Sequence, residues 1–461
     1  MNSQRFYSIS IVFLLSLVTA TSTIAQDRDP KAASQGPYLC NGVKMGDVTQ
    51  TSLVVWARLG KTKSYDRQTY RLPPSDGEIK VDTITQSGDQ TGVASTTGWV
   101  SVAANEDGVF ETILKSLKPA TKYRLNVAVR SAGSESVSDE VTTSFRTPPQ
   151  PDAKTDVNFA IMTCQKFLQM DDGENGFLTY KTLASQSLDF ASHTGDAVYY
   201  DQKPLLAQNA LDARTHWHRM YALSNIKVFN QGVPVFMIKD DHDTLKDDCW
   251  TGQRYNDLTF QEGVEIHREQ NPVGPLPYRT LRWGKHLQVW FVEGREYRTP
   301  NRKPDGPEKT ILGEQQIEWL KETIPASDAT FKLFVGATPL VGPDRDRKSD
   351  NHANSNFKFE GDWLRKFLAD ENVISINGDR HWQYVSRDPA TQLWEFGTGP
   401  VLDARAQGWK QSDKRPQHRF LRVAGGYLRG SVDSRHSPVK MTLSHHDVNG
   451  NETHRETFLA N

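Results

Sequence analysis

Residues 157–201 read VNFAIMTCQKFLQMDDGENGFLTYKTLASQSLDFASHTGDAVYYD and decide the fold class. Short apolar runs at 157–163 and 188–194 are typical of buried strands, and apolar residues at helical spacing lie between them over 177–184. The first run ends at a cysteine and the second at a Gly-Asp pair. Strand, helix and strand in this order predict an α/β domain of stacked layers.

The same alternation continues toward the C-terminus. Further apolar runs lie at 233–239, 287–292, 332–337 and 373–377. Two more helical stripes are formed by Ile317, Leu320 and Ile324, and by Leu364, Phe367 and Leu368. We therefore predict that the α/β domain spans 155–461, and that its long polar loops near 201–212, 244–262 and 341–358 surround a functional site.

The segment 36–147 has the alternation of half-buried strands and lacks helical periodicity, which predicts a β-sandwich. Leu117, Pro119, Thr121 and Tyr123 form an L-x-P-x-T-x-Y pattern that resembles a fibronectin type III module, where the tyrosine joins the two sheets at a corner. Three prolines within 148–151 stiffen the chain after it, so we predict the domain boundary there.

Residues 1–25 combine a polar start that carries Arg5, an apolar stretch from Ile9 to Ala20, and small residues before Gln26. This pattern predicts a cleavable signal peptide and a secreted or periplasmic protein, with an uncleaved N-terminal anchor as the alternative. The 461-residue chain has 55 Lys and Arg against 56 Asp and Glu, which argues against a nucleic-acid platform or a polybasic membrane patch. We expect a small-molecule partner and no stable membrane span.

The three cysteines, Cys40, Cys164 and Cys249, cannot all pair with one another in an exported protein. Cys164 ends a strand beside other metal-binding residue types and is a candidate ligand. The remaining two either form a disulfide between the domains or are buried thiols, and the sequence leaves both open.

Acidic or sulfur-bearing side chains follow four of the predicted strands. They are Cys164, Asp196 with Tyr199, Asp240 to Asp243, and Asp379 with His381. Ligands gather beyond the carboxyl ends of strands in α/β sheets, so we predict that these residues form one dinuclear metal site. Thiolate and phenolate ligands favour Fe(III), whereas a set of carboxylates favours Ca²⁺ or Mg²⁺.

The segment 157–400 resembles the PhoD-type alkaline phosphatases and phosphodiesterases of the calcineurin-like metallophosphoesterase group. The matching stretches, in order, are Thr163-Cys164-Gln165, Gly195-Asp196-Ala197-Val198-Tyr199, Asp240-Asp241-His242-Asp243, Glu293-Gly294-Arg295, Leu312-Gly313-Glu314-Gln315-Gln316 and Gly378-Asp379-Arg380-His381-Trp382. The resemblance implies a four-layer α/β/β/α domain preceded by the fibronectin-like sandwich. It also implies a phosphate-ester hydrolase in which a metal-bound hydroxide attacks phosphorus.

The resemblance further implies residue roles. Cys164, Asp196, Tyr199 and His381 would hold Fe(III), and Asp241 and Asp379 would hold Ca²⁺, with Asp240 either a ligand or a neighbour of the ligands. His242 would face the phosphate and be oriented by Asp243. Arg295 and Arg380 are candidates for binding the phosphate, with surface ion pairs as the alternative.

Two departures from the family pattern limit what can be carried over. A Sec-like leader replaces the family's common twin-arginine leader, and Lys239 and Asp243 replace the Trp and Glu of its motif. The preference among monoesters, diesters and phospholipids therefore stays open. Outside this chemistry, the alternatives are a hydrolase that uses Cys164 as a nucleophile and a secreted binding protein without catalysis.

Overall fold

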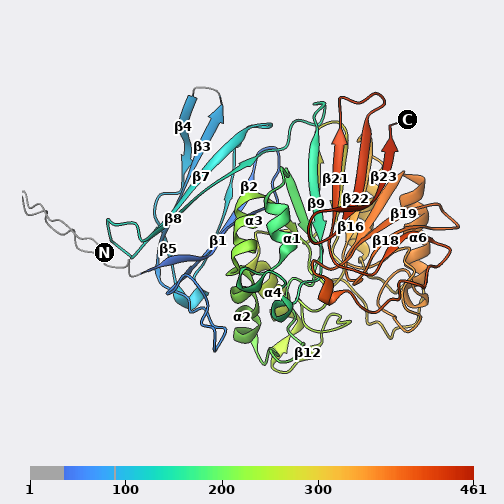
Figure 1. Ribbon diagram of the computed structural model, residues 1–461, viewed down its shortest axis with the longest axis horizontal. Coiled ribbons are helices and arrows are strands. Elements are labelled where there is room, and N and C mark those ends of the chain that lie inside the picture. Colours follow the sequence, from blue (N-terminus) through green and yellow to red (C-terminus); the bar gives the residue numbers. More distant parts are fainter. Residues whose placement is uncertain (1–35, 88–89, 461) are drawn as a thin grey trace, which may run out of the picture. The chain divides into compact units, whose positions relative to one another are not determined.

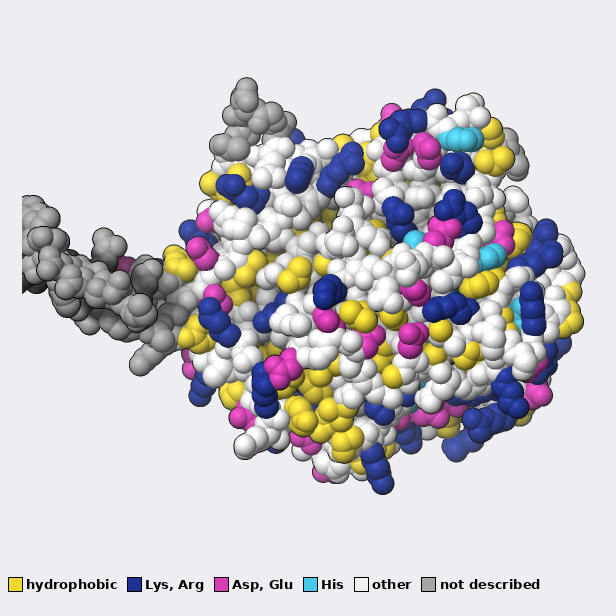
Figure 2. Space-filling view, in the orientation of Figure 1, with side chains coloured by type: hydrophobic (Ala, Val, Ile, Leu, Met, Phe, Trp, Pro, Cys, Tyr) yellow, Lys and Arg dark blue, Asp and Glu magenta, His cyan; other side chains and the backbone are white. Residues whose placement is uncertain are grey.

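A computed structural model describes residues 36–87 and 90–460, and the predicted signal peptide lies outside them. The chain from Gly36 onward forms one compact unit, so the domain limits 36–147 and 155–461 stay a prediction. Across the described ranges, every helix is too short or too polar to cross a membrane. Basic and acidic side chains are interspersed over the face in Figure 2, in line with the balanced charge of the sequence.

The N-terminal part is a β-sandwich of two antiparallel sheets (Figure 1). One sheet has the order β1 (Tyr38–Gly46), β2 (Leu53–Gly60) and β6 (Val109–Leu114). The other has the order β4 (Gln90–Thr96), β3 (Gly77–Ser87), β7 (Lys122–Arg130) and β8 (Asp139–Arg146), with β5 (Val100–Val102) also paired to β3. The hydroxyl of Tyr123 accepts a hydrogen bond of 2.8 Å from the Lys118 backbone N–H, which forms the predicted tyrosine corner.

Two larger mixed sheets form the rest of the chain. The six-stranded sheet has the order β11 (Val235–Met237), β10 (Phe190–His193), β9 (Val157–Met162), β21 (Tyr427–Asp433), β22 (Lys440–His446) and β23 (Glu452–Leu459). The seven-stranded sheet has the order β14 (Arg279–Trp283), β15 (Leu287–Phe291), β16 (Phe331–Gly336), β17 (Val373–Asn377), β19 (Trp394–Thr398), β18 (Gln383–Arg387) and β20 (His418–Arg422). A short hairpin of β12 (Arg254–Tyr255) and β13 (Leu258–Thr259) lies apart from both.

Helices cover the outer face of each large sheet, which gives the predicted four-layer α/β/β/α arrangement. Apolar side chains of α1 (Leu178–Ala184), α2 (Ala210–Tyr221), α3 (Ser224–Gly232) and α4 (Phe260–Gln270) pack on the first sheet, and those of α5 (Glu314–Thr323) and α6 (Lys358–Asp370) pack on the second. The inner faces share one apolar core, where the rings of Phe236 and Phe291 stack with centroids 4.5 Å apart. Strands buried on both faces read as continuous apolar runs, which explains the sequence pattern.

The parallel strands determine where the site forms. β9, β10 and β11 run parallel in one sheet, and β15, β16, β17 and β19 run parallel in the other. A bridge between Thr163 and Pro400 joins the ends of the two sets. The loops that follow these strands therefore meet at one edge of the paired sheets.

Candidate metal centre

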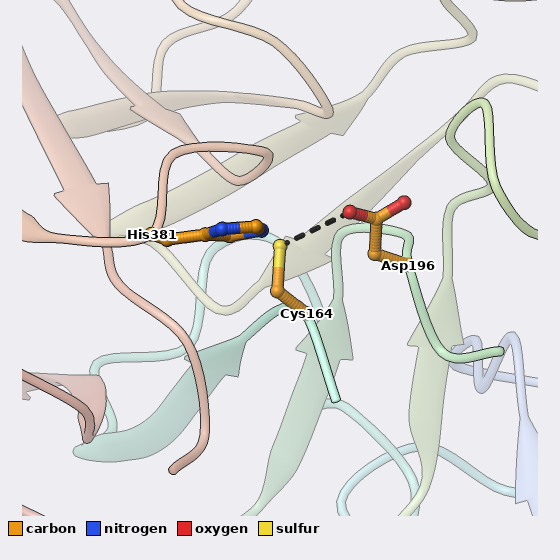
Figure 3. A group of neighbouring side chains, drawn as sticks. All are labelled: Cys164, Asp196 and His381. Atoms are coloured by element: carbon orange, nitrogen blue, oxygen red, sulfur yellow. Dashed lines mark hydrogen bonds between the residues drawn. The ribbon is translucent and has the colours of Figure 1, made fainter. Parts of the chain in front are cut away.

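The predicted ligands follow the carboxyl ends of parallel strands and lie together. Cys164 follows β9, Asp196 follows β10, Asp240 follows β11 and Asp379 follows β17, each within three residues of the strand end. Figure 3 shows Cys164, Asp196 and His381 side by side, although they come from three separate loops. Residues more than 200 positions apart in the sequence thus share one site.

Three of these residues have a left-handed backbone. The φ angles are 51° at Cys164, 59° at Asp196 and 56° at Asp379. Few non-glycine residues adopt this conformation, and such residues concentrate at functional sites, where the surrounding structure holds them. The three turns direct side chains from both sheets toward one point.

Two glycines permit the close approach of the ligand loops. At Gly195 a Cβ atom would lie 2.4 Å from the Asp240 Cβ and 2.6 Å from the Asp240 backbone nitrogen, and φ there is +98°. At Gly378 a Cβ atom would lie 2.4 Å from the hydroxyls of both Thr163 and Thr194. The glycine of each Gly-Asp pair is therefore needed for the loops to pack closely as well as for the turn.

Asp196 lies at the centre of the cluster. Its Oδ2 atom accepts hydrogen bonds of 3.3 Å from the Cys164 thiol and 3.0 Å from the Tyr199 hydroxyl. Asp196 also belongs to three groups of candidate ligand atoms that lie within 4.8 Å of one another: with Cys164 and His381, with Asp241 and His242, and with Asp240 and Asp379. One carboxylate thus joins a sulfur-containing set to a carboxylate-rich set.

The residues present fit a pair of cations. Asp196 Oδ1 and Asp240 Oδ2 are buried and have no hydrogen-bond partner among the described residues, although each belongs to an ionisable carboxylate. Burial, with Asp241 and Asp196, raises the pKa of Asp240 to about 8, and Arg295 only partly opposes this shift. Unpaired buried carboxylates are unfavourable unless a positive ion neutralises them.

Cys164 and Tyr199 need such an ion to become good ligands. Burial and the neighbouring Asp196 carboxylate raise the pKa of the Cys164 thiol and of the Tyr199 phenol well above their usual ranges. Reactive cysteines have the opposite environment, electropositive and partly exposed. The surroundings of Cys164 therefore favour a ligand over a nucleophile.

All three cysteines are free and buried, so the disulfide that the cysteine count left open is not formed. The Cys40 thiol lies 3.3 Å from the Arg58 carbonyl, and the Cys249 thiol lies 3.5 Å from the Asp241 carbonyl.

The imidazole of His242 lies at the rim of the cluster. Its centroid is 4.5 Å from that of the Tyr199 ring, and Nδ1 lies 2.6 Å from the carboxylate of Asp201. Asp201, which the sequence analysis did not select, therefore takes the orienting position expected of Asp243. The Asp243 carboxylate instead accepts hydrogen bonds from the backbone nitrogens of Asp240 and Ala197, so it braces the two ligand loops against each other.

Arg295 and Arg380 are both buried against carboxylates. The Arg295 Nε donates a 2.6 Å hydrogen bond to Asp240 Oδ1. Arg380 lies 3.2 Å from Asp344, and its guanidinium also contacts Asp379. Both arginines therefore have carboxylate partners, but these ion pairs are buried and are not the surface ion pairs of the alternative prediction.

Arg405 is a further cation at the centre that sequence reasoning missed. It belongs to the short 3₁₀ turn Asp403–Arg405 after β19, and its guanidinium carbon lies 4.5 Å from the centroid of the Tyr199 ring. Its Nε is buried without a hydrogen-bond partner in the described part of the chain. Burial opposes its charge, but Tyr199, Cys164 and Asp196 raise the pKa of Arg405 above its usual range. It lies seven residues beyond the end of β19, a strand that the sequence analysis did not predict, so no strand-end pattern marked it.

The family model of the PhoD-like phosphatases matches residues 159–445, more than half of the chain. The chain belongs to the PhoD-like phosphatase family. The match starts in β9 and ends in β22, so it contains every candidate ligand described above.

Curated and solved relatives agree with this membership. Alkaline phosphatase D of Bacillus subtilis (strain 168) is 23% identical over an alignment of 358 positions, which covers 62% of this chain and 59% of that protein. The alignment thus spans less than two thirds of the relative's own length. A solved structure of PhoD superposes with a TM-score of 0.71 at 18% identity, covering 94% of this chain and 92% of that one. The purple acid phosphatase PPD1 from yellow lupin (Lupinus luteus) seeds has a TM-score of 0.63 at 13% identity, with coverages of 90% and 74%. These superpositions confirm the predicted fold.

Proposed function

We propose that this chain hydrolyses phosphate esters at a dinuclear centre for Fe(III) and Ca²⁺, and that Asp196 is the residue that both ion sites would share. The observation that carries the proposal is the position of Asp196, shared by three groups of candidate ligands and left with a buried, unpartnered Oδ1. Cys164, Tyr199 and His381 would complete the iron site. Asp240, Asp241 and Asp379 would complete the calcium site, since carboxylate oxygens suit that ion.

The bound ions would supply the Lewis acidity that polarises the phosphoryl group and activates water for attack. The chain supplies the geometry around them. Arg295 fixes the Asp240 carboxylate through Nε and also donates to the Cys249 carbonyl at 3.2 Å. Because the guanidinium is fully buried and used in this way, we propose that Arg295 holds a ligand in place and does not bind phosphate.

His242 and Arg405 are our candidates for contact with the substrate. Asp201 holds Nδ1 of His242, and Nε2, which lies 3.7 Å from the exposed Asp247 carboxylate, is the atom that would donate a proton to the departing ester oxygen. Arg405 has an unpartnered Nε beside Tyr199 and Asp196, where a guanidinium can bind the non-bridging oxygens of a phosphate. We propose that Arg405 takes the role for which Arg295 and Arg380 were the sequence candidates.

Metal analysis and visible absorption of the purified protein test the centre. We expect iron and calcium in the isolated protein, and a phenolate-to-iron charge-transfer band that disappears in Tyr199→Phe. Asp196→Asn should lose both metals and the hydrolysis of aryl phosphates, while Asp370→Asn, an exposed change on α6, should lose neither. Full activity of Asp196→Asn, or active protein without metal, would defeat the proposal.

Alkylation separates this proposal from a cysteine nucleophile. A liganded thiolate at Cys164 should resist alkylation until a chelator removes the metal, and the variant Cys164→Ala should lose iron. Rapid alkylation of Cys164 in the metal-loaded protein, with parallel loss of activity, would favour the nucleophile.

We further propose that residues 1–25 direct export, so that the protein works outside the cytoplasm. N-terminal sequencing of protein from the culture medium or periplasm should begin after Ala25. Retention of the intact N-terminus in the membrane fraction would favour the uncleaved anchor.

A further inference from the structure

A pocket that Tyr199 helps to line adjoins the ligand cluster. Its lining includes the cationic side chains of Lys166, Lys203 and Arg219 and the apolar side chains of Phe167, Leu168 and Val198. Tyr199 is a wall of this pocket, while its hydroxyl lies 3.0 Å from Asp196 Oδ2. A group in the pocket would therefore be one aromatic ring away from the metal centre.

The lining combines three cationic side chains with apolar ones and includes no Asp or Glu. Within the described part of the chain, neither Lys166 nor Lys203 forms an ion pair through its ammonium group. The charge distribution favours an anion.

Arg219 provides the deepest of these charges. It is only 4% exposed, its guanidinium carbon lies 5.3 Å from the centroid of the Phe167 ring, and its Nε has no hydrogen-bond partner among the described residues. A terminal nitrogen lies 2.6 Å from Nδ1 of His216, which holds the guanidinium in one orientation. Burial lowers the pKa of Arg219 to about 10, so the group is still charged at neutral pH.

The nearest acidic side chain on the same helix does not neutralise Arg219. Asp212 favours the charge of Arg219 electrostatically, but its carboxylate accepts a hydrogen bond from the Gln208 backbone and lies 4.0 Å from Arg71. A buried cation with an open donor is unfavourable unless a partner fills the position. The free protein lacks that partner among its described residues, so a ligand is the natural candidate.

We propose that this pocket binds a second anionic group of the substrate. The proposal rests on the proposed function and narrows its substrate class to phosphate esters whose leaving group carries a short apolar link that ends in an anion. The apolar part would contact Phe167, Leu168 and Val198, and the anion would face Arg219, Lys166 and Lys203. The cavity is narrow, about 20 Å³, so only the anionic end of the leaving group would enter it and the apolar link would lie at its opening.

A matched pair of aryl phosphates tests the pocket. The probes are 3-(4-phosphooxyphenyl)propanoate and its primary amide, which have equal length and a similar leaving group but differ by one negative charge. The metal-loaded wild-type protein should prefer the carboxylate in kcat/KM. Lys203→Gln, an exposed change, should reduce that preference about fivefold, because one partly screened charge contact is worth about 1 kcal/mol.

Arg219→Gln should reduce the preference further, with the thermal midpoint recorded to show that the variant folds. Lys115→Gln, an exposed lysine of the sandwich, is the matched control and should leave the preference unchanged.

The outcomes distinguish failure of the pocket proposal from failure of the proposed phosphatase function. The pocket proposal is overturned if the wild type hydrolyses both esters without preference and Lys203→Gln and folded Arg219→Gln do the same. The phosphatase proposal would then still stand. Failure of the metal-loaded wild type to hydrolyse either ester would overturn both.

Discussion

The substitution Gly195→Ala tests whether the close approach of two loops builds the centre. The added methyl group would lie 2.4 Å from the Asp240 Cβ and 2.6 Å from the Asp240 backbone nitrogen, distances that side-chain rotation cannot relieve. The backbone at Gly195 also has φ of +98°, which alanine rarely adopts. We estimate about 1–3 kcal/mol for the backbone strain and about 1–3 kcal/mol for the overpacking.

Part of this energy would be relieved by moving Asp196 away from Asp240. A displacement of about 1 Å at a catalytic centre lowers activity about 100-fold, and misplaced ligand support lowers metal affinity about 10- to 100-fold. We therefore expect Gly195→Ala to be destabilised by about 2–6 kcal/mol and to retain little metal.

The assay compares metal content, unfolding by urea and aryl phosphate hydrolysis. Gly232→Ala is the matched control, since nothing lies within 4 Å of a Cβ atom at Gly232. It should keep metal and activity. Wild-type metal content and activity in Gly195→Ala would refute the argument that loop contact builds the site.

Three further predictions follow from the surroundings of the centre. Asp201→Asn should lower kcat about 10- to 100-fold while metal content stays constant, because Asp201 orients His242 without belonging to the ligand groups; loss of metal would contradict this role. Arg405→Gln should lower kcat/KM about 100-fold with iron retained, and unchanged kinetics would exclude phosphate binding by Arg405. Burial lowers the pKa of His193 and of His445 to about 3, so the unfolded chain binds their protons first as pH falls below 6.5. Each histidine should lower the free energy of unfolding by about 2 kcal/mol between pH 6.5 and 5. In urea unfolding, His445→Gln should show a shallower pH dependence than the wild type. An equal pH dependence in the two proteins would mean that the histidine is solvated in the folded protein.

The sequence predicted the strand-end residues well because chain direction determines their location. Buried parallel strands appear as short apolar runs, and the residue after each run must lie at the carboxyl edge of its sheet. Cys164, Asp196 and Asp379 were found in this way, and their left-handed backbone accounts for the close spacing of the turns.

Side-chain partners were harder to predict, since the direction in which a side chain points in the fold cannot be read from the order of the residues. Asp243 adjoins His242 in sequence, yet the Asp243 carboxylate faces backbone N–H groups and Asp201 reaches the imidazole. Arg295 and Arg380 follow predicted strands, but only the folded structure shows that carboxylates already surround them.

Long-range pairing also escaped the sequence analysis. β21, β22 and β23 complete the first large sheet, with β21 antiparallel to β9 across more than 260 residues. Their alternation is interrupted by polar residues on partly exposed faces, so no continuous apolar run marks them. The helices α2, α3 and α4 lie in segments that the sequence analysis treated largely as loops or left unassigned.

The central proposal is that Cys164, Tyr199 and Asp196 would hold an iron ion and that the neighbouring carboxylates would hold a second ion. Anomalous diffraction at the iron absorption edge from crystals of the metal-replete protein tests it most directly. We expect one iron peak within bonding distance of the Cys164 sulfur and the Tyr199 oxygen. An iron peak elsewhere, or none at these side chains in active protein, would contradict it.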